Sequence, residues 1–168
     1  VLELAHRLNI VAFDKTGTLT DGSMHVTDVV IPVSAQKTLG QSFDGILNEQ
    51  NVLSLALALE SQNDHPVARA IVGYCTSRSA QKLSVSEFSQ TPGSGVAGRV
   101  NAFGKNMVVI IGSPESVAHS AIALDASLVE AVARAHANAQ TASLLAVDGV
   151  AIAGKSISDC SCCEGFLS

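Results

Sequence analysis

Asp14 is the residue of this 168-residue chain whose setting most favours chemistry. It directly follows the apolar run 10–13, which is typical of a buried strand, and a turn containing Gly17 comes next. Open α/β sheets bind ligands at the carboxyl ends of their strands. A carboxylate at that edge can attack phosphorus and form an aspartyl phosphate. The same short pattern also fits an aspartate that only caps a turn.

The residues beside Asp14 suit a phosphoryl group. The ammonium of Lys15 and the hydroxyls of Thr16 and Thr18 suit a phosphoryl group with its Mg²⁺, and backbone N–H groups of the turn can bind the phosphate oxygens. Thr16 stands two residues after the nucleophile, where a carboxylate could act as a general base on water. Because a threonine cannot take that role, a phosphorylated Asp14 is expected to persist.

A second group of polar residues surrounds a predicted helix start. Glu60 ends one predicted helix, and His65 precedes Pro66, which suits the first turn of the next. An imidazole held at a helix entrance can hydrogen-bond to an adenine or stack on it, and Glu60 can accept from the adenine amino group. By themselves these residues fit a surface histidine beside the capping residue Asp64 better, because lone histidines are common.

A third feature is the glycine-rich segment 93–98, which contains Gly93, Gly95, Val96 and Gly98. Glycines let a backbone approach a ligand closely and expose N–H groups to phosphate or ribose. A strand rather than a helix is predicted to follow, which excludes the dinucleotide-binding fingerprint. A glycine-rich hairpin is the alternative.

Periodicity predicts an α/β opening followed by an α+β unit with an antiparallel sheet. Helices are expected at 1–8, 46–60, 67–77 and 124–138, and strands at 10–13, 24–31, 83–88, 96–100, 107–111, 144–147 and 150–153. The dipeptide at 148–149 predicts a hairpin turn between the last two strands. Residues 33–45 are interpreted as a linker. This order suggests a unit inserted into a Rossmann-like one, with boundaries at 1–33, 34–153 and 154–168.

Composition narrows the functional classes. Hydrophobic residues make up 47% of the chain, enough for a core, and the net charge is −5. The ten basic residues are scattered, which argues against nucleic-acid binding. No apolar run approaches the length of a membrane span, and no signal peptide is expected at the N-terminus. Cys160, Cys162 and Cys163 form an atypical tail rather than a disulfide framework, and a reducing compartment is expected.

The string 14–20, Asp-Lys-Thr-Gly-Thr-Leu-Thr, resembles the phosphorylation signature of P-type ATPases over all seven positions. Glu60 and His65-Pro66 resemble the Ser-Glu-His-Pro segment of the heavy-metal-transporting members, with Asn63-Asp64 in place of Ser-Glu. The glycine segment is similar to a loop that follows in those pumps. Gly112 stands where the family has Gly-Asn, with Ser113 in place of the Asn.

This resemblance implies an ATP-binding (N) domain inserted in a partial, haloacid-dehalogenase-like phosphorylation (P) domain. It implies ATP and Mg²⁺ as cofactors, with Asp14 and Thr16 as the magnesium ligands. The implied catalytic residues are Asp14, Lys15, Thr16 and Thr18, and the implied nucleotide-binding residues are Glu60, His65, Gly93, Gly95, Val96, Gly98 and Gly112.

At the level of the whole protein, the resemblance implies the cytoplasmic part of a membrane pump that transports heavy-metal cations, copper first, with zinc, cadmium and cobalt as open alternatives. Its expected partners are ATP and the remaining P domain, the actuator domain and the membrane domain, and the transported metal is not bound by this chain. The family's Thr-Gly-Asp and Gly-Asp-Gly-x-Asn-Asp segments do not occur here, so ATP binding with little or no turnover is expected.

Two other classes stay open at this point. The first is a soluble phosphatase or phosphotransferase of the haloacid dehalogenase type, which shares the aspartate nucleophile but usually carries an aspartate where Thr16 stands. The second is a non-catalytic nucleotide-binding fragment.

Overall fold

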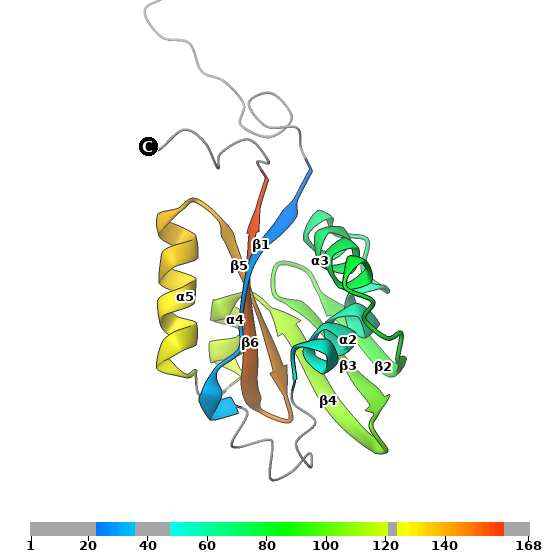
Figure 1. Cartoon of the computed structure of the whole chain (residues 1–168). Helices are drawn as coiled ribbons and strands as arrows, with labels where there is room; N and C mark the ends of the chain where they lie inside the picture. Colours follow the sequence, from blue (N-terminus) through cyan, green and yellow to red (C-terminus); the bar gives the residue numbers. More distant parts are fainter. Residues whose placement is uncertain (1–22, 36–47, 121–123, 160–168) are drawn as a thin grey trace, which may run out of the picture.

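The computed structural model describes residues 23–35, 48–120 and 124–159. The strands within these ranges are β1 (His25–Val30), β2 (Ser84–Thr91), β3 (Gly95–Ala102), β4 (Lys105–Gly112), β5 (Thr141–Val147) and β6 (Val150–Ser158). The helices are α2 (Glu49–Glu60), α3 (Pro66–Ser77), α4 (Pro114–His119) and α5 (Ala126–Ala137). The strands form one six-stranded antiparallel sheet in the order β1-β6-β5-β4-β3-β2 (Figure 1).

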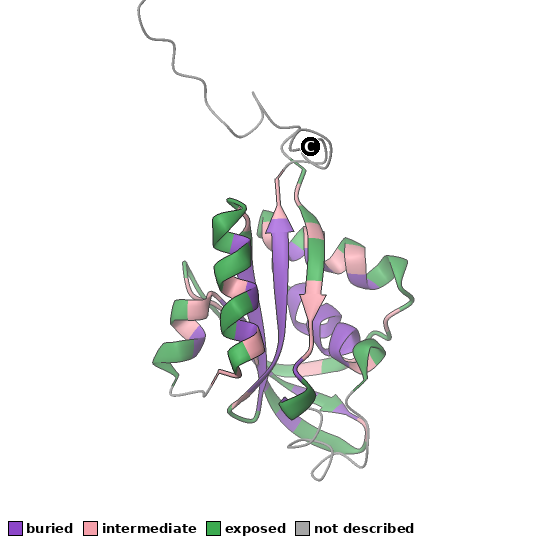
Figure 2. Cartoon of the chain, turned by 60° about the vertical axis from the view of Figure 1, so that its left-hand side comes forward, coloured by how far each residue is buried: buried purple, intermediate pink, exposed green. Residues whose placement is uncertain are grey.

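Helices cover both faces of this sheet, with α2 and α3 on one side and α5 on the other (Figure 1). Successive side chains of β5 therefore point to opposite faces of the sheet and pack against different helices. Leu145 and Val147 belong to the core that includes α2 and α3, whereas Leu144 and Ala146 belong to the core that includes α4 and α5. Figure 2 shows that β6 is buried along nearly its whole length. The centre of the sheet is therefore the driest part of the described structure.

Helix α2 is buried around its circumference, which is unusual for a helix on a sheet face. Its residues from Val52 to Glu60 are all buried, and Asn48 caps its first turn by accepting from the Asn51 N–H at 2.8 Å. The helix packs against α3 as well as against β2, β3 and β4. A helix that is apolar all round is stable only when it is enclosed in this way.

Strand β1 joins two distant parts of the chain, because it pairs with β6 from His25↔Ser158 to Val30↔Gly154. The start of β1 and the end of β6 consequently lie side by side. This sheet includes residues on both sides of the predicted boundaries at 33 and 153. The division into three units stays a prediction, since most of the first and last segments lies outside the described residues.

The expected elements that fall within the described residues are confirmed, including the antiparallel sheet and the hairpin at Asp148-Gly149. Strand β6 runs to Ser158, five residues beyond its predicted end at 153. Helix α4 was not expected, although Ser113 and Pro114 are typical of a helix start. The helix predicted at 1–8, the strand at 10–13 and most of the linker lie outside the described residues. In the described ranges, no helix has the length and apolarity needed to cross a membrane.

Candidate nucleotide-binding site

The carboxylate of Glu60 lies at the end of α2 and is only 4% exposed. Its Oε2 accepts a hydrogen bond from Asn63 Nδ2 at 3.0 Å. Burial raises the pKa of Glu60, while the Asn63 amide and the charges of Lys155 and His65 act in the opposite direction. An ionised carboxylate has about four acceptor positions. Glu60 therefore keeps acceptor capacity for a ligand that carries N–H groups.

His65 is the N-cap of α3. Its Nδ1 accepts from the Val67 N–H at 3.2 Å, and Pro66 occupies the first helical position. A ring nitrogen that accepts carries no proton, so in the neutral ring the proton is on Nε2. The cap thus fixes both the position of the imidazole and the nitrogen that can donate to a ligand.

Asn63 links three elements of the site. Besides donating to Glu60, its Oδ1 accepts from the backbone N–H of His65 at 3.1 Å and from Gln90 Nε2 at 3.1 Å. Asn63 therefore connects the end of α2, the start of α3 and strand β2. The sequence analysis assigns Asn63 no role beyond replacing a serine of the family segment. Its hydrogen bond to Gln90, 27 residues away, cannot be predicted from the local sequence.

Gly95 and Gly112 are register partners where β3 begins and β4 ends. Gly95 has φ +143°, and a Cβ built on it would lie 2.1 Å from the carbonyl oxygen of Ile111. A Cβ on Gly112 would lie 2.4 Å from the carbonyl oxygen of Ser94. Side chains cannot be accommodated at such distances, so both glycines are required by the backbone packing of the site wall itself.

These features surround one cavity of about 350 Å³, within the range of roughly 300–1,000 Å³ that is usual for small-molecule sites. Its walls come from the α2–α3 connection, the β2–β3 turn, the end of β4 and the start of β5. The lining residues are Glu60, Asn63, His65, Val67, Gln90, Thr91, Pro92, Gly93, Ser94, Gly95, Val96, Ile111, Gly112, Ser113, Thr141, Ala142 and Ser143.

The structure brings most of the predicted nucleotide-binding residues together. Of that set, Glu60, His65, Gly93, Gly95, Val96 and Gly112 line the cavity. Gly98 lies further along β3, where a built Cβ would be 3.0 Å from Val85 Cγ1, and it is outside the cavity wall. The strand segment 141–143 was not predicted to line a site, because its spatial neighbours are distant in sequence. Which residues contact a nucleotide stays a prediction.

The predicted catalytic and magnesium residues, Asp14, Lys15, Thr16 and Thr18, lie outside the described residues. Within the described ranges, no group of three or more His, Cys, Asp or Glu side chains is arranged to hold a metal ion.

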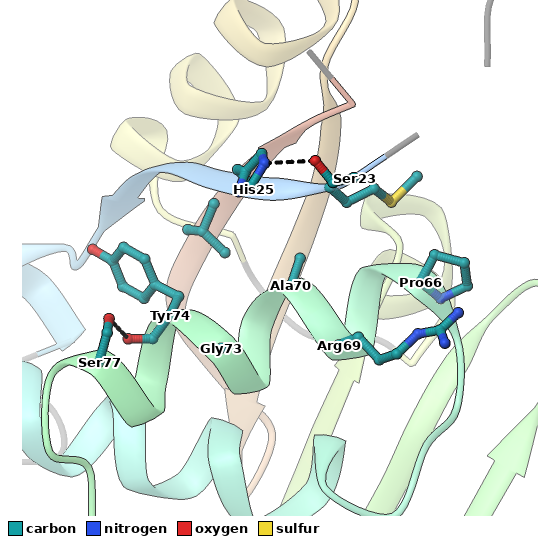
Figure 3. A pocket seen from close by; sticks show the side chains of 10 residues that line it. Ser23, His25, Pro66, Arg69, Ala70, Gly73, Tyr74 and Ser77 are labelled. Carbon is teal, nitrogen blue, oxygen red and sulfur yellow. Dashed lines mark hydrogen bonds between the residues drawn. The ribbon is translucent and has the colours of Figure 1, made fainter. Parts of the chain in front are cut away.

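A second cavity of about 580 Å³ lies between β1 and α3 (Figure 3). Its wall includes His25, Arg69 and Tyr74, and His25 is hydrogen-bonded to Ser23 at 2.9 Å. This cavity is larger, but none of the predicted site residues lines it. It also lacks a buried carboxylate such as Glu60 among its lining residues. The smaller cavity is therefore the better candidate for a specific site.

A family model described as haloacid dehalogenase-like hydrolase matches residues 8–156. The chain is 39% identical over 119 residues to the chloroplastic copper-transporting ATPase PAA1 of Arabidopsis thaliana, which covers 70% of this chain and 12% of that protein. It is 37% identical over 126 residues to the copper-exporting P-type ATPase B of Archaeoglobus fulgidus, covering 75% of this chain and 16% of that protein.

Among solved structures, the crystal structure of the N-domain of HMA6, a copper-transporting P-type ATPase, is similar with a TM-score of 0.60 and 28% sequence identity. The match covers 81% of this chain and 99% of the HMA6 N-domain. The fold predicted from the sequence, a P-type ATPase N domain with an antiparallel sheet, is thereby confirmed. The chain spans only 12% of the length of the Arabidopsis relative and 16% of the length of the Archaeoglobus relative.

The close contact at Gly95 generates a stability prediction. Gly95→Ala is expected to lower the free energy of unfolding by about 3 kcal/mol or more, because an overlap with the Ile111 carbonyl adds to the cost of a positive φ. The matched control is Gly93→Ala, whose φ is +76° and whose built Cβ meets nothing within 4 Å. It should lose only about 1 kcal/mol. Urea unfolding measures both, and equal losses would contradict the packing role of Gly95.

Proposed function

We propose that this chain, which belongs to the haloacid dehalogenase-like hydrolase family, is the ATP-binding part of a P-type ATPase that moves heavy-metal cations across a membrane. Copper is the first candidate cargo, because the curated relatives named above are copper pumps. In the complete pump the chain would lie on the cytoplasmic side and work with the remaining P domain, the actuator domain and the membrane domain. The transported ion would bind elsewhere in the pump.

The observation that carries this proposal is the cavity that joins Glu60, His65 and the glycine turn. An adenine is flat and apolar on its faces, and its amino group donates hydrogen bonds. The cavity offers a matching set: a buried carboxylate acceptor, an imidazole held by a helix cap, and apolar walls from Val67, Val96 and Ile111. Burial of Glu60 in a site of low polarity strengthens any hydrogen bond that it accepts there.

The backbone around Gly93 and Gly95 has a different task from the adenine contacts. Gly93 lies in the tight β2–β3 turn with φ +76°, and nothing lies within 4 Å of the position its Cβ would take. This open side lets a ribose or a phosphate approach the turn closely. The base would then lie toward Glu60, with the triphosphate leaving past the glycine turn.

The phosphoryl transfer would take place on Asp14. The Asp14 carboxylate oxygen attacks the γ-phosphorus of ATP, the bond to the β,γ-bridging oxygen breaks, and ADP leaves with the electron pair. Water later hydrolyses the aspartyl phosphate and releases inorganic phosphate. Thr16 supplies no general base, which favours a lasting phospho-enzyme over the rapid turnover of a soluble phosphatase. Asp14 and Thr16 would hold Mg²⁺, which neutralises phosphate charge when bound.

Removing the imidazole tests the adenine site. His65→Gln is expected to weaken ATP binding about tenfold, the worth of one hydrogen bond or stacking contact of 1–2 kcal/mol. His25→Gln is the matched control, because it makes the same change in the cavity between β1 and α3. Calorimetric titration of ATP into both variants is the measurement. An equal loss in the two variants, or none in either, would sink the assignment of His65.

The nucleophile can be tested in the complete pump. Asp14→Asn is expected to abolish the acid-stable, hydroxylamine-sensitive phosphoprotein that forms from labelled ATP, since an amide cannot form the acyl phosphate. The present chain with the same substitution should bind ATP as the unchanged chain does. Phosphoprotein that persists in the Asn variant of the pump would contradict Asp14 as the phosphorylation site.

A further inference from the structure

Lys155 is a buried lysine that the proposed chemistry leaves unused. It lies in β6 and is 4% exposed, and its neighbours two residues away, Ala153 and Ile157, belong to the core formed with α2 and α3. Within the described part of the chain, its Nζ has no hydrogen-bond partner. Burying an ammonium without a partner is expensive, so an apolar residue would be the expected choice here. A compensating charge nearby is the simplest reason for a lysine.

The residues around Lys155 come from four elements. Glu60 of α2 and Cys75 of α3 both interact with it electrostatically, and Val29 of β1 and Ser143 of β5 are its register partners. Burial lowers the pKa of Lys155, and the charges of Cys75 and Glu60 oppose this effect. Burial also raises the pKa of Cys75, which favours its uncharged thiol. Glu60 is the carboxyl group of this set, and its pKa is likewise raised by burial and lowered by the charge of Lys155.

This arrangement places Lys155 next to the wall of the nucleotide cavity. Glu60 and Ser143 both line that cavity, and Lys155, the register partner of Ser143, is not among its lining residues. The other groups that act on Glu60 are Asn63, through its hydrogen bond, and His65, through its charge. Arg78 acts on Cys75 but is not among the groups that influence Glu60.

We infer that Lys155 is a positioning residue of the nucleotide site, whose buried ammonium keeps Glu60 in the carboxylate form that accepts from the adenine amino group. The inference rests on the proposed ATP-binding function. Lys155 does not touch the ligand and acts only through the charge of Glu60. In a dry wall such an interaction is weakly screened and works without a direct hydrogen bond.

The primary test needs no nucleotide. The protonation of Glu60 is followed by carbon-13 NMR of its carboxyl group from pH 4 to 9 in the unchanged chain, in Lys155→Met and in Lys82→Met. Methionine keeps the unbranched stem of lysine and removes the charge. Lys82 is exposed, so Lys82→Met makes the same change in net charge away from the site. The inference expects the Glu60 midpoint to move to higher pH in Lys155→Met only. An unchanged midpoint in Lys155→Met overturns it.

ATP titrations of the same three proteins distinguish a failure of this inference from a failure of the proposed ATP-binding function. Because removal of Lys155 lets Glu60 protonate at higher pH, the affinity of Lys155→Met relative to the unchanged chain should fall as the pH is lowered, by about tenfold where only the variant is protonated. Comparing ratios cancels the titration of ATP itself. A shifted midpoint with a pH-independent ratio overturns the role of Lys155 in binding. A shifted midpoint with no ATP binding by any protein contradicts the proposed function while leaving the charge coupling in place.

Unfolding experiments test whether folding lowers the pKa of Lys155, as its burial requires. A lysine whose pKa is lowered by folding binds fewer protons in the folded than in the unfolded state between its two pKa values, so stability rises with pH in that window. The free energy of unfolding of the unchanged chain should therefore rise relative to that of Lys155→Met as the pH increases toward 10. No such relative rise would mean that folding does not lower the pKa of Lys155, which contradicts the burial on which the inference is built.

Discussion

The burial of β5 and β6 on both faces is the constraint on which the rest of the structure depends. A strand buried on both faces needs helices on both sides, and here α2 and α3 cover one face while α4 and α5 cover the other. Because α2 is enclosed between the sheet and α3, its last residue, Glu60, is buried with it. The acidic group of the candidate site is therefore dry as a consequence of how the core is built.

The shape of the site follows from two further contacts. Asn63 fixes the connection between α2 and α3 by bonding to Glu60, His65 and Gln90. On the opposite wall, the meeting of Gly95 with the Ile111 carbonyl sets how closely β3 and β4 approach. The cavity lies between these two contacts. Its titratable groups, Glu60 and His65, come from the helix connection and its backbone surface from the sheet, which suits a ligand with a hydrogen-bonding base at one end and phosphates at the other.

Local signals in the sequence were enough to predict most helices and strands. Contacts between residues far apart in the chain could not be predicted from it. Pro66 and the Asp148-Gly149 turn mark boundaries by their own backbone preferences, so α3 and the β5–β6 hairpin could be placed from sequence. The pairing of β1 with β6, more than 120 residues away, has no local signal. The partners of Asn63 and the burial of Lys155 likewise depend on which strands become neighbours. The motif around Asp14 was recognisable from its residues alone and lies outside the described part of the chain.

The central claim is that ATP occupies the cavity between the α2–α3 connection and the β2–β3 turn. Mapping amide chemical shifts of the nitrogen-15-labelled chain during an ATP titration tests it most directly. The account predicts saturable shifts concentrated at Glu60, Asn63, His65 and residues 93–96, with little change at Arg69, Gly73 and Tyr74. Shifts concentrated instead along the cavity between β1 and α3, or the absence of any saturable shift, would contradict it.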